Sequence, residues 1–431
     1  MNRNIFHRCL LAMAALTVAV AADAQEFSEL FRDSTLRIDY IFGGNASEQH
    51  IYLDKMSMTS RWHGKRSRMD EVPMEGNGQV IVRSASTGKV IYRNSFSTLF
   101  QEWLAYPEAL NTSRSFENAF LIPMPKDSVS VSIELRNNRR EKVAGMTHIV
   151  DPDDIMIRDF SGTATVPYSV VSSATDKDKG IDIAFVAEGY GKDEMDVFRS
   201  HVSEAVEALF AHEPFKSDKD RFNIVAVMAE SEDSGTSEPS KKIWRQTALG
   251  SHFDTFYSER YLTTLNIKRL HDILTGIPYE HIIILVNTSS YGGGGILNSY
   301  NLSMTKHRLY SQVVVHEFGH SFAGLADEYA YEQEEIPMYP ADVEPWEKNI
   351  TTLIDFNSKW RDMMDDDAVV PSVLSKKAVD ENKTGVYEGA GYSLRGVYRP
   401  APDCRMRSNE HGEFCRVCQR IIKEVIDFYT E

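Results

Sequence analysis

A chain of 431 residues has room for about three domains of ordinary size. Hydrophobic residues make up 42% and charged residues 26%, a balance typical of a globular protein that excludes a disordered polymer, a coiled-coil rod and a collagen-like repeat. The formal net charge is -16, and an acidic surface repels phosphate backbones, so we expect no nucleic-acid partner.

Residues 1–24 have the pattern of a secretory signal peptide. Arg3 and Arg8 precede a nearly uninterrupted apolar run over 9–22, and residues 22–24 read Ala-Asp-Ala, a small-x-small cleavage site. The run has about 14 residues, fewer than the ~20 that a membrane-spanning helix needs. We therefore expect cleavage before Gln25, no membrane span, and a protein that is secreted, periplasmic or held at the cell surface.

Residues 25–165 read as a domain of strands and turns. Apolar residues alternate with polar ones in two stretches, and this period-two pattern indicates sheets with one buried face. The alternating positions are Leu36, Ile38, Tyr40 and Phe42, then Val129, Val131, Ile133 and Leu135. We predict an N-terminal β-sandwich that ends near residue 165.

Residues 166–431 alternate strands with helices, which is the pattern of an α/β or α+β domain. Buried strands are predicted over 181–187, 222–228 and 281–287, and helices over 193–212 and 268–274.

The sequence YSQVVVHEFGHSFAGLADEY, over 310–329, carries the chemistry. His316 and His320 are four residues apart, so both imidazoles project from one face of a helix and can bind one Zn²⁺. Glu317 follows the first histidine and lies beside the metal rather than on it. In that position it takes a proton from zinc-bound water and delivers it to the leaving amine.

The third ligand is expected just after this helix. Gly324 is predicted to end the helix by a left-handed turn that sends the chain back toward the metal. In the metzincin pattern HExxHxxGxxH the last ligand follows the glycine by three residues. With one inserted residue that position is Asp327, which is favoured over Glu328. If both acids form only a solvated turn, the ligand comes later. The later candidates are Glu332, Glu334 and Glu335.

Two further features fit a peptidase. Four glycines precede the zinc helix, and their backbone can pair with an extended peptide as an added strand, although a solvent loop is an equal alternative. These glycines are Gly292, Gly293, Gly294 and Gly295. Met406 suits the methionine that metzincins place in a tight turn beneath the metal, with ordinary core packing as the alternative. Tyr392 and Tyr398, just upstream, are candidate donors to a developing oxyanion.

Three cysteines lie in the last 28 residues: Cys404, Cys415 and Cys418. Outside the cytoplasm an odd number favours one disulfide and one remaining thiol. With His411 between them, the three thiols can instead form a small structural metal site.

The string HEFGHSFAGLADEY, with the downstream Cys-Arg-Met-Arg and Phe-Cys-Arg-Val-Cys, resembles the immunoglobulin-A-peptidase family of secreted bacterial zinc metallopeptidases. The resemblance implies an N-terminal β domain followed by a metzincin-like catalytic domain. It also implies a zinc endopeptidase with His316, His320 and Asp327 as ligands and Glu317 as the catalytic acid and base.

We therefore predict an exported peptidase that hydrolyses protein substrates with one catalytic Zn²⁺ and Glu317 as general base. The alternative is a surface protein whose β domain binds a glycan or host protein and whose metal site is structural or vestigial. A closed fourth position on the metal would support that alternative, because catalysis needs one position open for water.

Overall fold

The structure is a computed structural model that describes residues 27–162, 164, 166–331, 338–372 and 383–431. The predicted signal peptide therefore lies outside the described residues, as do Glu332, Glu334 and Glu335. No helix in the described ranges has both the length and the apolar character to cross a membrane.

The N-terminal region consists of two four-stranded sheets with the orders β5-β1-β2-β8 and β4-β3-β6-β7. All neighbours are antiparallel except β2 and β8. The strands are β1 (Phe31–Gly44), β2 (Gln49–Ser60), β3 (Gly78–Ser84), β4 (Val90–Phe96), β5 (Arg114–Pro125), β6 (Val129–Arg136), β7 (Lys142–Val150) and β8 (Arg158–Asp159). Burial alternates residue by residue along β6, and apolar side chains of β1 and β6 share one core. The predicted N-terminal β-rich fold is confirmed.

The second half is built on a six-stranded sheet with the order β13-β14-β12-β10-β11-β9. The four inner strands are parallel and both edge strands are antiparallel. The strands are β9 (Tyr168–Ser172), β10 (Ile181–Glu188), β11 (Phe222–Val227), β12 (His281–Val286), β13 (Gly293–Ile296) and β14 (Tyr300–Met304). The three predicted strands are β10, β11 and β12, and every residue of β10 and β12 is buried, as expected for parallel strands covered on both faces.

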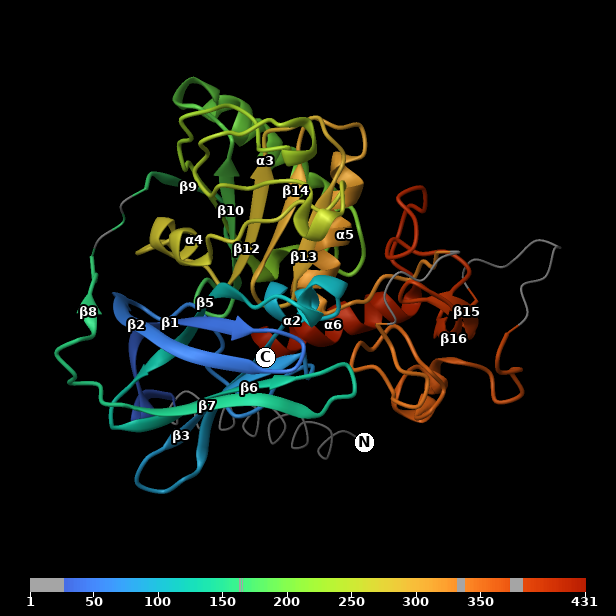
Figure 1. The fold of residues 1–431 in the computed structure, drawn as a ribbon, viewed down its shortest axis with the longest axis horizontal. Helices are drawn as coiled ribbons and strands as arrows, with labels where there is room; N and C mark the ends of the chain where they lie inside the picture. Colours follow the sequence, from blue (N-terminus) through green and yellow to red (C-terminus); the bar gives the residue numbers. More distant parts are fainter. Residues whose placement is uncertain (1–26, 163, 165, 332–337, 373–382) are drawn as a thin grey trace, which may run out of the picture.

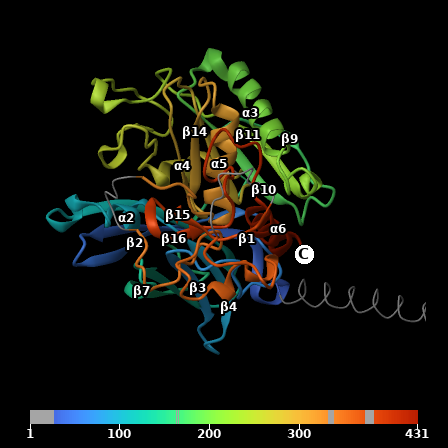
Figure 2. The ribbon, with the colours of Figure 1, turned by 90° about the vertical axis from the view of Figure 1, so that its right-hand side faces the viewer.

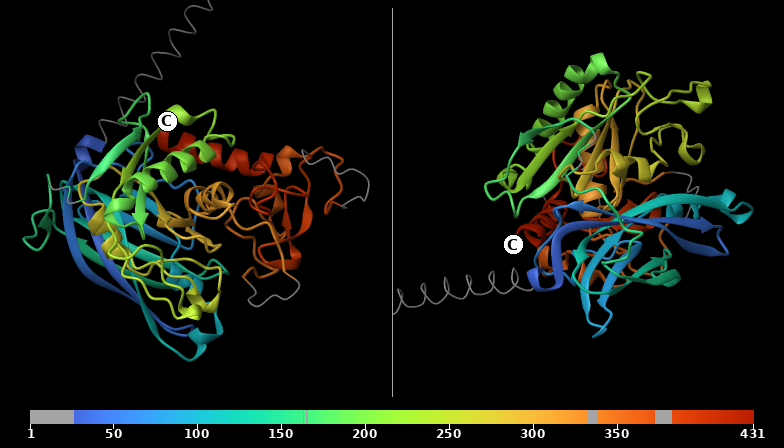
Figure 3. Two further views of the ribbon diagram at one scale, coloured as in Figure 1. Left: turned by 90° about the horizontal axis from the view of Figure 1, so that it is seen from above. Right: turned by 90° about the vertical axis from the view of Figure 1, so that its left-hand side faces the viewer.

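Helices and loops cover the two faces of this sheet. The helices are α2 (Leu99–Trp103), α3 (Met195–Leu209), α4 (Ile267–Ile273), α5 (Tyr310–Ala323) and α6 (Arg416–Thr430), and a hairpin of β15 (Tyr387–Ala390) and β16 (Ser393–Arg399) precedes α6. Figures 2 and 3 show α3 on one side of the sheet, and the right-hand view of Figure 3 shows the segment between β11 and α4 on the other side. The helix predicted over 193–212 is shorter at both ends, because residues 192–194 form a 3₁₀ turn and Phe210 caps the helix.

The N-terminal sheets lie across one end of the six-stranded sheet, and α6 runs along the boundary (Figure 1). Alternate residues of β10 belong to different cores. Ala184 and Val186 join the core that contains the N-terminal strands, whereas Ile183 and Phe185 join the core beneath α3, α5 and α6. The segment predicted as a domain boundary, near residue 165, connects β8 to β9. The two halves of the chain thus share buried apolar surface.

Candidate active site

Helix α5 carries both histidines of the HExxH sequence on one face. Its apolar residues, among them Val314, Phe318 and Phe322, are buried in the core beneath the six-stranded sheet. His316 and His320 are one turn apart and project together from another side of the helix, with their Nε2 atoms 3.0 Å apart. The apolar periodicity of the helix therefore fixes the direction of the two imidazoles.

A left-handed turn at Gly324 ends α5 and returns the chain to the histidines, as the sequence predicts. The φ angle of Gly324 is +58°, and Leu325 directly after it places its carbonyl oxygen 2.5 Å from Nδ1 of His320. Two residues later Oδ1 of Asp327 lies 3.1 Å from Nε2 of His316 and 3.3 Å from Nε2 of His320. The structure thus brings Asp327 to the histidines and directs Glu328 elsewhere.

The three facing atoms are all hydrogen-bond acceptors. Nδ1 of His316 lies 3.0 Å from the carbonyl oxygen of Arg405, and Nδ1 of His320 faces the carbonyl of Leu325. A carbonyl only accepts, so each imidazole in its neutral form carries its proton on Nδ1 and points the lone pair of Nε2 inward. Oδ1 of Asp327 is buried and receives no hydrogen bond. Three acceptors at this separation repel one another unless a cation lies among them.

The spacing fits a metal ion. Zn²⁺ bonds of about 2.0–2.1 Å in tetrahedral geometry place ligand atoms roughly 3.3 Å apart, close to the separations in this triangle. Carbonyl partners on the outer nitrogens are also the usual way in which metal-binding histidines are oriented. The donor set of two imidazoles and one carboxylate therefore fits Zn²⁺.

The electrostatics of the triangle also favour an added positive charge. Burial disfavours the protonated form of His320, but the carboxylate of Asp327 raises the pKa of this imidazole to about 9. Burial alone would raise the pKa of Asp327, but His320 and His316 hold it well below its ordinary value. The group thus stabilises one extra cation, either a proton or a metal ion.

Glu317 lies beside this triangle without belonging to it. A Cβ atom placed on Gly293 would be 2.6 Å from Oε1 of Glu317, so the carboxylate lies directly against strand β13. Burial and the nearby Asp327 raise the pKa of Glu317, while His316 and His320 lower it, and burial dominates. A raised pKa suits a carboxylate that both takes and returns a proton near neutral pH.

The four glycines form a packed strand and its approach, which excludes the solvent-loop alternative. Gly293 and Gly295 face α5, whereas Gly292 and Gly294 face residues 260–262, and a Cβ at any of the four would lie within 3.0 Å of another atom. The close approach of backbone on both faces explains why glycine is needed here. The NH of Leu262 already donates to the carbonyl of Gly293 (3.4 Å). The chain itself therefore occupies part of the edge that was predicted to receive an added strand.

Met406 lies in a turn directly below α5. The turn covers residues 404–407, and its first carbonyl accepts a hydrogen bond from the NH of the fourth residue (2.9 Å). The side chain of Met406 is fully buried, and a Cβ on Gly319 would be 2.8 Å from its sulfur. The residue before it accepts from His316, and its own carbonyl accepts from the NH of Glu328 (2.8 Å). The turn thus supports both α5 and the segment that carries Asp327.

The two tyrosines predicted as oxyanion donors have different positions. The hydroxyl of Tyr392 donates to Oδ2 of Asp327 at 2.5 Å, so it orients the carboxylate. The backbone of Tyr398 pairs with Thr351, and Glu388 is the charged residue that acts on its hydroxyl. Sequence reasoning therefore placed Tyr392 near the site but gave it a different role.

One charged residue near the site comes from the N-terminal region, and no motif marks it. Glu102 on α2 accepts a hydrogen bond from the hydroxyl of Tyr261 at 2.5 Å. Burial raises the pKa of Glu102 to about 7, and both His320 and Asp327 act on it electrostatically. Only the tertiary structure brings this carboxyl close to the histidines.

The cysteines do not form the predicted disulfide. Cys404, Cys415 and Cys418 are free and buried, and Sγ of Cys404 is 3.9 Å from Sγ of Cys418. His411 does not join them, because its Nδ1 is bonded to the carbonyl of Glu413 at the surface. The fourth side chain of this group is Glu328.

Comparison with known families agrees with the resemblance seen in the sequence. The family described as IgA Peptidase M64 matches residues 170–384 and 372–426, and the family described as Peptidase M64 N-terminus matches residues 26–146. No curated protein matches the chain. The first match covers more than half of the chain and includes the HExxH helix, Asp327 and Met406. The chain belongs to the IgA peptidase M64 family and is a peptidase.

Proposed function

We propose that the protein is a zinc-dependent endopeptidase in which His316, His320 and Asp327 hold the catalytic ion. The observation that carries the proposal is the triangle formed by Nε2 of His316, Nε2 of His320 and Oδ1 of Asp327, which lie 3.0–3.3 Å apart. The outer nitrogen, Nδ1, of each imidazole faces a backbone carbonyl. When bound, the ion supplies a Lewis acid that polarises the scissile carbonyl and lowers the pKa of the attacking water.

Glu317 provides the acid and base of the reaction. Its carboxylate takes the proton of the attacking water and then delivers it to the leaving amine. Strand β13 holds this carboxylate from one side, because Gly293 leaves just enough room for it. The backbone carbonyls of Leu325 and Arg405 keep both imidazoles oriented during the reaction.

The number of ligands supports a catalytic rather than a structural ion. In the described part of the chain, the group around His316 contains three possible ligands. Catalytic zinc centres combine three protein ligands with one open position, whereas structural centres have four. A binding protein with a structural metal site would need a fourth side chain here.

Substrate binding is proposed along the free part of β13. The chain itself uses the carbonyls of Gly293 and Leu297, which accept from Leu262 and Ser97. Between them, Gly295 lies against His320 and Glu317. An extended peptide that pairs at Gly295 therefore runs beside the turn of α5 that carries Glu317 and His320, two residues along the strand from Gly293, which contacts the Glu317 carboxylate.

We also infer that the peptidase acts outside the cytoplasm. The inference rests on the sequence of residues 1–24, in which two arginines, an apolar run and a small-x-small site follow one another. N-terminal sequencing of the exported protein should begin at Gln25, and a start at Met1 would contradict the inference.

The catalytic proposal is tested by Glu317→Gln. The amide keeps the shape of the side chain but cannot take the proton, so we expect unchanged zinc content and a fall in kcat/KM of about 10²- to 10⁴-fold. Metal analysis and digestion of a peptide library, with and without a chelator, measure both quantities.

The matched control is Glu207→Gln on the exposed side of α3, which should keep full activity. His316→Ala should lose both the catalytic ion and the activity. Undiminished cleavage by Glu317→Gln would refute the assignment of the base.

A further inference from the structure

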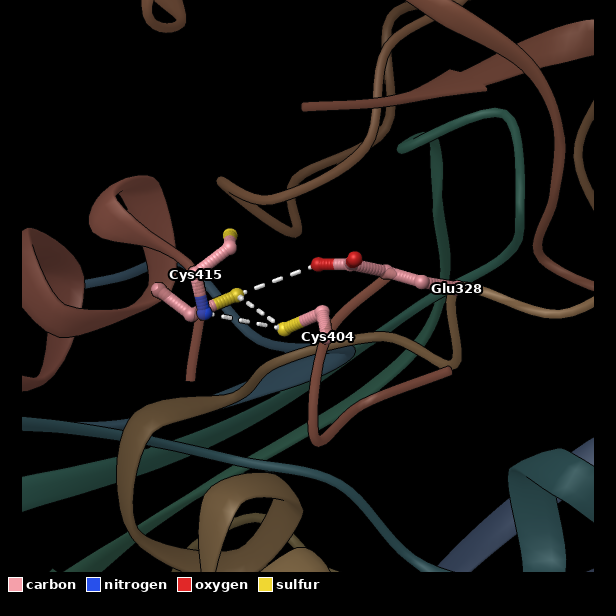
Figure 4. Close-up of side chains that lie close together, drawn as sticks. Glu328, Cys404 and Cys415 are labelled. Carbon is pink, nitrogen blue, oxygen red and sulfur yellow. Dashed lines mark hydrogen bonds between the residues drawn. The ribbon is translucent and has the colours of Figure 1, made fainter. Parts of the chain in front are cut away.

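A second cluster of side chains that could bind a metal ion begins with the residue after Asp327. It consists of Glu328, Cys404, Cys415 and Cys418, and one ligand atom from each lies within 4.8 Å of all the others. All four residues are buried, and Glu328 is fully inaccessible to solvent. Figure 4 shows the side chains of Glu328 and Cys404 converging from separate segments, with Cys415 alongside.

Three structural elements build this group. Glu328 directly follows Asp327 in the segment between α5 and Ala330, and the two carboxylates belong to different groups of side chains. Cys404 begins the turn that contains Met406. Cys415 is the N-cap of α6 and Cys418 lies in its first turn, so the Cys-x-x-Cys spacing puts both thiols at one helix end.

Hydrogen bonds within the group satisfy its polar atoms only in part. Oε1 of Glu328 accepts from Nδ2 of Asn349 at 3.0 Å and from Sγ of Cys418 at 3.1 Å, but the buried Oε2 receives no hydrogen bond. The sulfurs of Cys404 and Cys418 are 3.9 Å apart. Two thiolates on one Zn²⁺ lie about 3.8 Å apart, given Zn–S bonds of about 2.3 Å, whereas a disulfide has a length of about 2.05 Å.

Two buried arginines carry positive charge, and neutral thiols would leave that charge uncompensated. Arg399 and Arg405 are 4% and 3% exposed, and within the described residues both guanidinium groups donate to backbone carbonyls rather than to a carboxylate. Arg399 acts electrostatically on Glu328, and Arg405 acts on Cys404. Three thiolates, one carboxylate and a divalent cation have a net charge of -2, which two guanidinium groups neutralise. Buried charges are retained in proteins when they are compensated in this way.

We propose that Glu328, Cys404, Cys415 and Cys418 hold a second zinc ion, in a closed four-ligand structural site. Thiolates select a soft or borderline cation, and four protein ligands leave no position for substrate. The ion ties together the segment after Asp327, the Met406 turn and the start of α6. It thereby fixes Asp327 and the carbonyl of Arg405, both of which contact the catalytic histidines.

Zinc analysis of the purified full chain tests the proposal. We expect two zinc ions per chain, one in His316→Ala and one in Cys418→Ser. Zinc X-ray absorption should show sulfur neighbours in the wild type and in His316→Ala, where sulfur should account for most of the ligands. Replacement by Co²⁺ should give a thiolate-to-metal charge-transfer band that Cys418→Ser lacks.

The control is His411→Ala, which removes the imidazole that lies between the cysteines in sequence but outside the group in space. This variant should keep both ions and the charge-transfer band. The band does not depend on the catalytic proposal, because His316→Ala should retain it even if Glu317 proves dispensable.

Three results would overturn the proposal. One is a wild-type protein without sulfur in its zinc coordination shell, a measurement that needs no variant to fold. Another is loss of the band in His411→Ala. The third is a disulfide between any two of the three cysteines, detected by mass spectrometry of peptides from protein alkylated after unfolding in chelator.

Discussion

Two carboxylates that are neighbours in the chain serve different groups of side chains. Asp327 faces two imidazoles with a single buried oxygen, whereas the next residue, Glu328, faces three thiols. A zinc ion with three protein ligands keeps one coordination position open for water or substrate, whereas four protein ligands fill all positions. In the two sites that we propose, Asp327 would therefore hold a reactive ion and Glu328 a structural one.

The hydroxyl of Tyr392 is expected to matter for metal affinity. It donates to Oδ2 of Asp327, and removal of a partner that orients a ligand usually costs about 10- to 100-fold in metal binding. We expect Tyr392→Phe to weaken zinc binding at the histidine site by that factor, measured by competition with a chelator.

Tyr398→Phe is the matched control, because this hydroxyl lies on β16 away from Asp327. It should leave zinc affinity unchanged. An unchanged affinity in Tyr392→Phe would show that Asp327 needs no such partner.

At the level of single residues, local patterns identified the HExxH segment and its turn, and the metzincin pattern added Met406, 86 residues past His320. His316, Glu317 and His320 follow from helical spacing, and Asp327 follows from the turn that Gly324 permits. Glu102 and the pairing of Glu328 with the cysteines depend on contacts between segments more than 70 residues apart, and no local pattern contains them.

Strand β13 is the element on which the geometry of the site depends most closely. It lies at the edge of the sheet and carries no side chains for three residues, so α5 packs directly on its backbone. A strand interior made of glycine is weak in isolation, and it forms here because β14 and α5 hold it on two sides. The glycines thus lower the intrinsic stability of β13 but allow α5 to pack closely on its backbone.

Substitution of one glycine tests this role. In Gly293→Ala the new methyl group would be 2.6 Å from Oε1 of Glu317 and 2.9 Å from Cγ1 of Val313. The end of the Glu317 side chain can move away, so we expect a folded protein with normal zinc content. Its kcat/KM should fall about 100-fold, because a misplaced base loses the reacting geometry.

Gly412→Ala provides the control, since a Cβ there meets no atom within 4 Å. It should retain full activity. Wild-type kinetics in Gly293→Ala would show that the position of Glu317 tolerates displacement.

Among the elements, the long apolar runs were predictable and the edges of the sheet were not. Burial on both faces makes β10, β11 and β12 continuous hydrophobic runs that sequence reveals within one residue. The glycine-rich β13 and the short β14 lack such a signal, since their strand conformation comes from pairing with neighbours. The helix before β11 was predicted too long, because residues 192–194 form a 3₁₀ turn and Phe210 caps the helix.

In the whole molecule, the N-terminal sheets and the peptidase sheet are joined by charged and polar contacts around a shared core. Arg37 of β1 is 2.6 Å from Asp272 of α4, and the NH of Ser97 donates to Leu297 at 3.1 Å. The indole of Trp346 donates to Asn77 at 2.7 Å. The sequence predicts the two folds separately, but it contains no pattern that reveals the buried surface between them.

A cut just before β8, the last strand of the N-terminal sheets, should therefore leave the two fragments associated. Ile155 and Met156 are 95% and 73% exposed in the segment between β7 and β8, which makes this segment a good substrate for limited proteolysis. We expect the two fragments to elute together in gel filtration under native conditions and to separate in denaturant. Separation without denaturant would mean that the shared core contributes little to the association.

The alternation of β10 between two cores has a consequence for maturation. Removal of a prosegment is unfavourable when it exposes apolar core residues of the remaining enzyme to water. Loss of the N-terminal strands would expose part of this shared apolar core to water. We therefore expect the amino-terminal half to remain in the mature enzyme.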